Sequence, residues 1–358
     1  MRLGVAPPVA SHREVAHGGI YSSGLAYDPK ILDFSSNVNP LGFPPAVRKS
    51  LGGTIALFST YPDSQSTALR KRLGGYTGIP SGQITVGNGA TEIIYNFCKA
   101  FMHGKRALIP VPTFGEYESA AKLEGAKVSY FETMDLNRDI DAFLKAIPGK
   151  HCVFVCNPNN PTGVLASKKN MIKILDASKR NSALVFVDEC FIELSDPGQS
   201  VVEKIRSFEN LFVLRSLTKS FGLAGLRVGY GLGSRKMVEV LNRVKIPWNV
   251  SGIAQSLAVA ALSEPSFLEK TRKMIARERN YLRKSISGIG GFECLGSEAN
   301  FVLVRSKTPP KKLQKKLLKK NILVRDCSSF RGLGGSFIRI AVRTRRENLR
   351  LVEELGRI

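Results

Sequence analysis

The sequence predicts an α/β fold with room for a large and a small domain. Short apolar runs alternate with stretches of helical periodicity, which is typical of strands and helices that alternate along the chain. A chain of 358 residues is long enough to bury a sizeable core. A long helical stretch over 264–286 is expected to lead into the small domain. The expected strands are Ile109–Pro112, Cys152–Cys156, Val185–Val187, Leu211–Leu214 and Arg227–Tyr230.

Lys219 lies among small residues and is followed by Arg227. Ser216, Ser220 and Gly222 leave room for a group packed closely against the lysine, and an arginine can pair bidentately with a phosphate. These features favour a lysine that binds pyridoxal phosphate through a Schiff base. A surface lysine in a polar loop is the alternative interpretation.

Asp188 ends the buried run Val185–Val187. In an open α/β sheet, ligands bind at the carboxyl ends of the strands. A buried aspartate needs a cationic partner, and the protonated pyridine nitrogen of the same cofactor would be one. A helix N-cap or a salt bridge would also explain this residue.

Two turns carry further polar groups. Residues 87–92 follow a short strand and open a helical pattern, so their backbone N–H groups favour an anion site. A plain helix cap by Asn88 or Thr91 explains the same residues. The turn Asn157–Gly163 follows another strand, and its Asn160 side chain can reach a ring hydroxyl.

In this order and spacing, these four elements resemble the fold-type I pyridoxal-phosphate enzymes, the class I/II aminotransferase superfamily, over nearly the whole chain. The resemblance implies a large domain with a mostly parallel central sheet and a smaller α+β C-terminal domain. It also implies pyridoxal 5′-phosphate as cofactor and a homodimer with composite active sites. The implied boundaries are an N-terminal arm packing on the small domain (1–45), the large domain (46–262) and the small domain (263–358).

The resemblance also implies the site residues. Lys219 and Asp188 would be catalytic, Asn160 would bond the phenolic oxygen of the cofactor, and Phe114 would stack on its ring. Tyr61 matches a tyrosine that reaches the phosphate from the neighbouring subunit. The full set expected at the cofactor is Tyr61, Asn88, Gly89, Ala90, Phe114, Asn160, Asp188, Ser216, Lys219 and Arg227.

Two subfamilies are the closest in pattern: histidinol-phosphate aminotransferases and the threonine-phosphate decarboxylases of cobalamin synthesis. His17–Gly19 and the following segment 33–42 resemble the N-terminal signature of the decarboxylases. Phe191 stands where the aminotransferases usually have tyrosine, and it cannot donate to the phenolic oxygen. The segments Ile246–Val250 and Val324–Phe330 also resemble the decarboxylases.

Arg325 and Arg339 lie at two late strands and suggest two anionic groups on the substrate. Arg339 would hold the carboxylate, while Arg325 and His17 would hold a phosphate; which arginine takes which group stays open. The sequence therefore predicts decarboxylation of L-threonine O-3-phosphate to 1-amino-2-propanol phosphate and carbon dioxide. The alternatives are a histidinol-phosphate aminotransferase and a non-catalytic binding protein. The residues expected at this phosphorylated amino-acid substrate are His17, Gly18, Gly19, Asn39, Trp248, Arg325 and Arg339.

The chain carries a formal net charge of +24, yet no aromatic-interleaved motif for specific nucleic-acid recognition accompanies it. Lys311–Lys320 predicts an amphipathic helix with a solvated face. The six cysteines lack paired spacing, which predicts buried reduced thiols and no metal site. We find no signal peptide and no apolar run long enough to span a bilayer, so we expect a cytoplasmic protein without a membrane partner.

Overall fold

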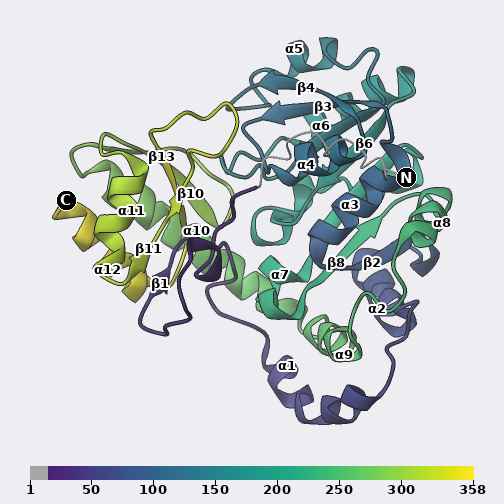
Figure 1. Ribbon diagram of the computed structural model, residues 1–358, viewed down its shortest axis with the longest axis horizontal. Coiled ribbons are helices and arrows are strands. Elements are labelled where there is room, and N and C mark those ends of the chain that lie inside the picture. Colours follow the sequence, from purple (N-terminus) through teal and green to yellow (C-terminus); the bar gives the residue numbers. More distant parts are fainter. Residues whose placement is uncertain (1–14) are drawn as a thin grey trace, which may run out of the picture.

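The computed structural model describes residues 15–358. Its larger part is built on a seven-stranded sheet in the order β2-β8-β7-β6-β5-β3-β4 (Figure 1). The sheet is parallel except for β8, which runs antiparallel to both of its neighbours. Its strands are β2 (Ile84–Asn88), β3 (Arg106–Val111), β4 (Lys127–Glu132), β5 (Cys152–Cys156), β6 (Leu184–Asp188), β7 (Leu211–Ser216) and β8 (Val228–Leu232).

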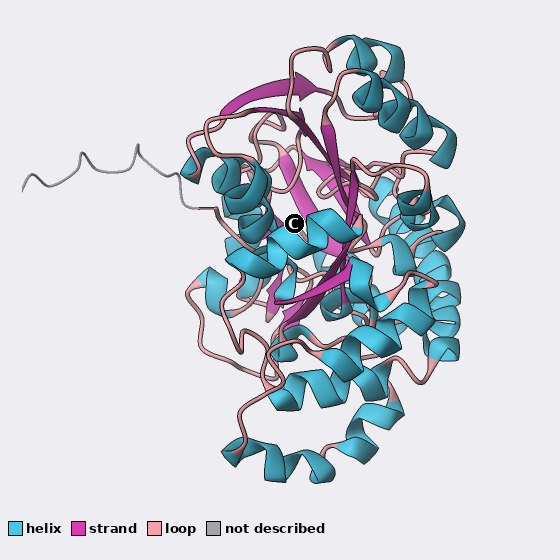
Figure 2. Ribbon diagram, turned by 90° about the vertical axis from the view of Figure 1, so that its right-hand side faces the viewer, coloured by secondary structure: helices cyan, strands magenta, loops and turns pink. Residues whose placement is uncertain are grey.

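Helices lie on both sides of these strands (Figure 2). They pack through amphipathic faces; the first turns of the third helix, for example, bury Ile93, Ile94 and Phe97. Phe97 packs edge-on against Phe186 of β6, with ring centroids 4.8 Å apart. The helices are α1 (Pro45–Ser50), α2 (Thr67–Thr77), α3 (Gly89–Phe101), α4 (Glu116–Leu123), α5 (Ile140–Lys145), α6 (Lys168–Arg180), α7 (Leu217–Ser220), α8 (Arg235–Val244) and α9 (Gly252–Ala261).

The smaller part is an antiparallel sheet in the order β12-β13-β10-β9 with three helices beside it. The register of its β12–β13 pair sets Arg325 directly opposite Arg339. Its elements are α10 (Pro265–Ser287), β9 (Phe292–Cys294), β10 (Phe301–Ser306), α11 (Pro310–Leu318), β12 (Arg325–Asp326), β13 (Phe337–Ala341) and α12 (Arg345–Gly356).

A short parallel ladder joins the N-terminal segment to the smaller part. In it β1 (Leu32–Asp33) pairs with β11 (Ile322–Leu323). The expected arm therefore contacts the C-terminal part through 32–33, while residues 1–14 of that arm lie outside the described residues.

The strands expected from apolar runs are all present, and α10 and α11 match the two helical patterns expected near the C-terminus. The sequence missed β4, β9 and β10 and the two-residue strands β1 and β12. β4 is a partly exposed edge strand without a long apolar run, so the sequence pattern does not indicate it. β10 begins with four consecutive buried apolar residues, and this run could have predicted a strand. All six cysteines are buried and unbridged. Within residues 15–358, no helix is long and apolar enough to cross a membrane.

Candidate active site

A cavity of about 1080 Å³ lies where the ends of β5, β6 and β7 meet the smaller part. Parallel strands place their carboxyl ends at one edge, so residues far apart in the sequence meet there. The cavity brings together most of the expected site residues. Those that line it are His17, Gly18, Ala90, Phe114, Asn160, Asp188, Ser216, Lys219, Arg227, Arg325 and Arg339.

Asp188 is a buried carboxylate at the end of β6. The Tyr117 hydroxyl donates to its Oδ2 at 2.6 Å, and the Cys190 N–H donates to its Oδ1 at 2.8 Å. Burial raises the pKa of Asp188, although both hydrogen bonds act in the opposite direction. None of the cationic side chains in residues 15–358 forms an ion pair with it. The carboxylate therefore has space for a cationic group from a ligand.

Lys219 lies on α7, directly after the strand that ends at Ser216. The Ser216 hydroxyl accepts from the Thr218 N–H at 3.1 Å and so caps this short helix. Burial lowers the pKa of Lys219 to about 8, and the positive charge of Arg339 adds to this effect. More of this amine is thus neutral and nucleophilic near neutral pH than in a lysine of ordinary pKa.

The N-terminus of α3 and Arg227 form a candidate phosphate cradle. The Asn88 side chain makes no capping bond here, while the Glu92 carboxylate accepts from the Asn88 N–H, and Ala90 and Thr91 from the first turn line the cavity. Gly89 has a φ of 79°, and a Cβ added there would overlap the Arg227 guanidinium. The missing side chain therefore lets Arg227 approach the helix end, where an anion would meet both.

Arg339 is buried and reaches across the cavity from β13. Its Nη2 donates to the Ser35 carbonyl at 2.9 Å and its Nη1 donates to Asn160 Oδ1. Its Nε has no hydrogen-bond partner among the described residues. Burial lowers the pKa of Arg339 to about 10. A buried donor without a partner is costly, so this atom favours an anionic ligand beside it.

Arg325 holds the N-terminal segment in this structure. Its Nη1 donates to the His17 carbonyl and its Nη2 to the Ala16 carbonyl, both at 2.6 Å. The His17 ring pairs with Glu116 of α4 at 2.8 Å. A Cβ on Gly18 would overlap the Ser35 carbonyl, so the chain needs glycine there. The segment thus connects the smaller part to α4 at the rim of the cavity.

Phe191 has the position expected from the sequence, on the cavity wall after β6. It is buried, and its ring packs edge-on against Phe301 of β10 with centroids 5.2 Å apart. The Arg339 guanidinium lies 5.4 Å from the same Phe301 ring. Phe191 therefore presents an aromatic ring without a hydroxyl group on this wall, with the Phe301 ring packed against it.

Six expected site residues do not line the cavity of this chain: Gly19, Asn39, Tyr61, Asn88, Gly89 and Trp248. Asn39 is buried, and its side-chain amide donates to the Ser220 carbonyl at 2.7 Å, so it supports the Lys219 segment from behind. The Gly19 N–H donates a hydrogen bond to Ser35 Oγ at 2.7 Å. Asn88 is exposed, and Tyr61 and Trp248 are exposed side chains with ring centroids 5.2 Å apart.

Sequence reasoning missed two polar groups at the cavity. Tyr117 is fully buried and bonds Asp188, although the two residues are far apart in the sequence. Asn37 lines the cavity with a buried Oδ1 that has no partner among the described residues. Asn37 lies inside the polar segment 33–42, and this position could have identified it as a site residue. Nothing in the sequence pointed to Tyr117.

The site offers a protein partner for the pyridine nitrogen, the aldehyde and the phosphate of pyridoxal phosphate. Asp188 offers a carboxylate for the pyridine nitrogen, Lys219 an amine for the aldehyde, and the α3 N-terminus with Arg227 a cradle for the phosphate. A cavity with this set of groups on an α/β fold defines a pyridoxal-phosphate-dependent enzyme.

The aminotransferase class I and II family model matches residues 29–355. The histidinol-phosphate aminotransferase of Methanococcus aeolicus is 34% identical over 92% of this chain and 90% of its own length. A Caldanaerobacter subterraneus protein named "Putative threonine-phosphate decarboxylase" is also 34% identical, over 95% of this chain and 92% of its own. The chain belongs to the class I and II aminotransferase family, whose members use pyridoxal phosphate.

Solved structures resemble the fold equally well in both subfamilies. The histidinol-phosphate aminotransferase of Clostridium acetobutylicum has a TM-score of 0.85 at 32% identity, over 91% of this chain and 98% of its own. The L-threonine-O-3-phosphate decarboxylase of Porphyromonas gingivalis has a TM-score of 0.84 at 26% identity, over 90% and 98%. Fold similarity therefore does not separate the two reactions.

The pKa of Lys219 predicts how cofactor capture depends on pH. In the cofactor-free protein, the rate of forming a borohydride-reducible link to added pyridoxal phosphate should rise with pH and level off above about 8, because only the neutral amine reacts. Arg339→Met should move this midpoint upward, because it removes a nearby positive charge. A midpoint that stays in place in this variant would show that Arg339 does not act on the amine.

Proposed function

We propose that this enzyme decarboxylates L-threonine O-3-phosphate, giving 1-amino-2-propanol phosphate and carbon dioxide. The observation that carries the proposal is the pair of cations on one cavity wall, with Arg325 directly opposite Arg339 in the β12–β13 register. Like charges this close repel each other, so a substrate with two anionic groups would relieve the repulsion. Threonine phosphate carries a carboxylate and a phosphate on one small molecule.

Arg339, Arg325 and Lys219 would have separate roles in this reaction. Arg339 would hold the carboxylate through its unpartnered Nε, and Arg325 would take the phosphate together with His17. Pyridoxal phosphate supplies the electron sink for a bond broken at Cα. Lys219 would return a proton to the substrate carbon, since its amine lies in the same cavity.

Phe191 supports decarboxylation over amino transfer. By the family resemblance, aminotransferases usually have tyrosine here, whose hydroxyl would donate to the cofactor's phenolic oxygen. Phe191 has no such donor and packs on Phe301 instead. The segment that contains His17 and Gly18 also lines the cavity, as the decarboxylase-like signature predicts.

A histidinol-phosphate aminotransferase is the second candidate. Relatives of that name are 32–36% identical to this chain and outnumber the decarboxylase among the similar proteins compared. Such an enzyme would share the cofactor residues and a phosphate-bearing substrate. It would use Arg339 for the carboxylate of the amino acceptor, because histidinol phosphate itself has none.

The test compares the two reactions in the same purified holoenzyme. With O-phospho-L-threonine alone, we expect release of carbon dioxide and formation of 1-amino-2-propanol phosphate. With histidinol phosphate and 2-oxoglutarate, we expect little glutamate. Glutamate formation without release of carbon dioxide from phosphothreonine would replace the decarboxylase with the aminotransferase.

Arg325→Ala should lower kcat/KM for phosphothreonine about 10- to 100-fold, because a charge-assisted hydrogen bond contributes roughly 1.5–3 kcal/mol. Unphosphorylated threonine should lose far less. Arg325→Lys keeps the charge and should recover part of the loss. Equal losses for both substrates would instead assign Arg325 to holding the Ala16 and His17 carbonyls.

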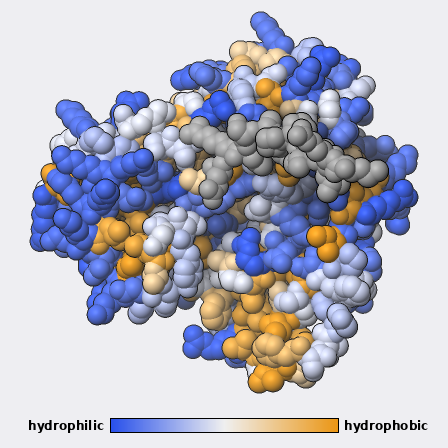
Figure 3. Space-filling view, in the orientation of Figure 1, coloured by the Kyte–Doolittle hydropathy of each residue, from blue (hydrophilic) through white to orange (hydrophobic). Residues whose placement is uncertain are grey.

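The surface supports a homodimer with shared sites. Figure 3 shows apolar side chains gathered at the bottom of the molecule, over the 3-10 helix η2 (Gly52–Ser59). Tyr61, which the family resemblance places at the neighbouring subunit's phosphate, is 81% exposed here. An apolar surface of this kind is typical of an interface. Its exposed members are Leu51, Ile55, Phe58, Tyr61, Ile246 and Trp248.

Mixing a Tyr61→Ala variant with a Lys219→Ala variant, each inactive alone, should restore about a quarter of the wild-type activity. Random exchange makes half of the dimers hybrid, and each hybrid has one of its two sites intact. Activity is measured before and after exchange, which mass spectrometry of tagged subunits verifies. No recovery despite verified exchange would mean that Tyr61 does not complete the partner's site.

A further inference from the structure

α11 presents an exposed face of lysines at the C-terminal part of the molecule. Between residues 299 and 325 the sequence contains no aspartate or glutamate. Two lysine rows with a spacing of four residues run along the helix and its C-terminal turn. All six side chains are exposed, and none forms an ion pair with the described residues: Lys311, Lys315 and Lys319 in one row, and Lys312, Lys316 and Lys320 in the other. We call these six residues the α11 lysine face.

Elsewhere on the same part of the molecule, several basic residues have acidic partners. On α10, Lys273 pairs with Glu269 at 2.7 Å, and Arg279 pairs with Glu298 at 2.9 Å. Arg305 of β10 pairs with Glu293 at 2.9 Å. The α11 lysine face differs because its own stretch of chain contains no acidic residue that could pair with the lysines.

This concentration of charge disfavours the helix. Like charges four residues apart destabilise a helix. The opposite face offsets this cost, since Leu313 and Leu317 are fully buried against the smaller part. Packing therefore holds the lysines in a fixed array. Arg350 of α12 donates to the Lys320 carbonyl at 2.8 Å and adds an exposed cation at the end of the array.

None of the six lysines lines the catalytic cavity. In Figure 1, α11 lies on the side of the smaller part that faces away from the large sheet. The array is therefore available to a partner without obstructing the site of the reaction.

We propose that the α11 lysine face binds the phosphate backbone of nucleic acid without reading its sequence. Each row spans about 12 Å, at about 1.5 Å per helical residue. On a duplex, each strand carries one phosphate per about 3.4 Å of helix axis, so one row covers three or four nucleotides of a strand. The net charge of +24 would attract a polyanion from a distance.

The chemistry of the face favours a backbone contact over base recognition or membrane insertion. Its stretch, Lys311–Lys320, contains no aromatic residue on which a base could stack. A helix that inserts into a membrane surface buries its apolar side in the lipid. The leucines of α11 are instead buried in the protein.

The experiment measures fluorescence anisotropy of two labelled 20-nucleotide single strands of unrelated sequence, over a series of salt concentrations. The holoenzyme should bind both strands alike. A variant with Lys311→Gln, Lys315→Gln and Lys319→Gln should show a salt slope smaller by about 2, at about 0.7 per lost phosphate contact. Its affinity at low salt should fall at least tenfold. Glutamine suits a helix, so α11 should remain folded.

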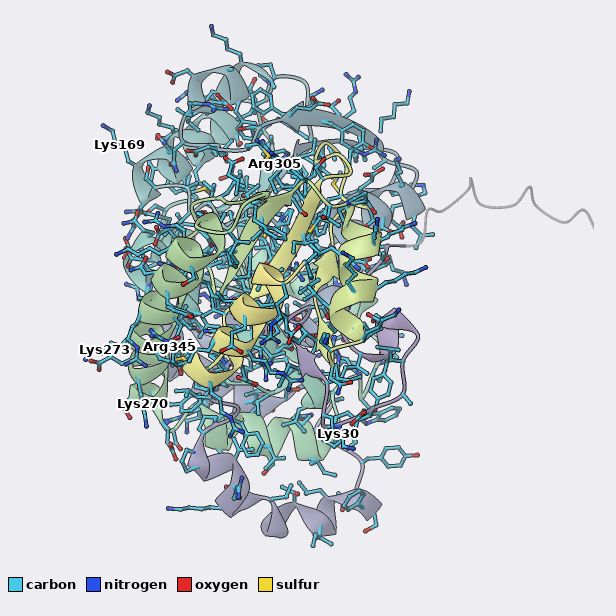
Figure 4. The ribbon with its side chains drawn as sticks, turned by 90° about the vertical axis from the view of Figure 1, so that its left-hand side faces the viewer. Lys30, Lys169, Lys270, Lys273, Arg305 and Arg345 are labelled. Atoms are coloured by element: carbon cyan, nitrogen blue, oxygen red, sulfur yellow. The ribbon has the colours of Figure 1, made fainter. Side chains whose placement is uncertain are left out.

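The matched control removes three lysines from separate elements: Lys30→Gln, Lys169→Gln and Lys270→Gln. These side chains are exposed and far apart (Figure 4), and the net charge changes equally. The control should keep the original salt slope, and both variants should keep their turnover. Equal losses in the two variants would reduce the effect to general charge attraction and overturn the proposal. A holoenzyme that binds neither strand would also overturn the proposal. The same holds for an α11 variant that keeps its affinity for both strands but loses binding to phosphatidylglycerol vesicles.

Discussion

Lys219→Ala should lose the borohydride-reducible link to pyridoxal phosphate and nearly all turnover. A positioned acid–base group contributes about 10²–10⁴-fold to a rate, and this change also removes the covalent attachment of the cofactor. The Lys219 amine is the group concerned because it lies in the cavity that holds Asp188 and Arg227. Reductive labelling followed by peptide mapping checks the attachment, and release of carbon dioxide from O-phospho-L-threonine, the substrate we propose, checks the turnover.

Lys245→Ala is the matched control. Burial lowers the pKa of Lys245 as well, but this lysine lies outside the cavity, where its Nζ donates to the Ser64 carbonyl at 3.1 Å. It should keep both the label and the activity. If Lys219→Ala remained active and labelled at another lysine, the assignment of the reactive amine would be wrong.

Arg215→Met should lower the free energy of unfolding by about 3–5 kcal/mol, since removing one partner of a buried ion pair leaves the other charge without compensation. The Arg215 guanidinium is buried between two buried carboxylates. Its Nη2 bonds Glu189 at 2.9 Å, and its Nη1 lies 3.6 Å from Glu193. A native protein has only about 5–15 kcal/mol in total, so this loss is a large fraction.

Urea unfolding of the wild type and the variant measures this effect. Arg305→Met is the control, because the Arg305–Glu293 pair is exposed and should contribute less than about 1 kcal/mol. Glu189 follows Asp188 directly, and Arg215 precedes Ser216, so Arg215→Met should also weaken cofactor binding. Equal stability of the two variants would mean that the buried network is not important for the fold.

The cofactor site could be predicted from the sequence because its residues come from strand ends and short turns. Asp188 and Lys219 each follow a buried apolar run, and parallel strands bring such ends together. The spacing of these residues along the chain was therefore enough to predict that they meet at one site. The decisive signals were the strand pattern and the short motif, and both are local.

Contacts between distant segments could not be predicted in this way. Tyr117 of α4 bonds Asp188 of β6, and Arg325 bonds the carbonyl groups of Ala16 and His17. The sequence shows that Arg325 is basic but not which carbonyl groups it meets. Trp248 was expected at the substrate and instead lies at the surface.

The ladder between β1 and β11 constrains the order in which the protein forms. Its two strands, 32–33 and 322–323, are separated by almost the whole chain. Contacts between residues so far apart in sequence form slowly, because the intervening chain must first lose its freedom. During synthesis, β1 must wait for its pairing partner until residues 322–323 have left the ribosome. The large sheet, whose strands lie between residues 84 and 232, can assemble well before that point.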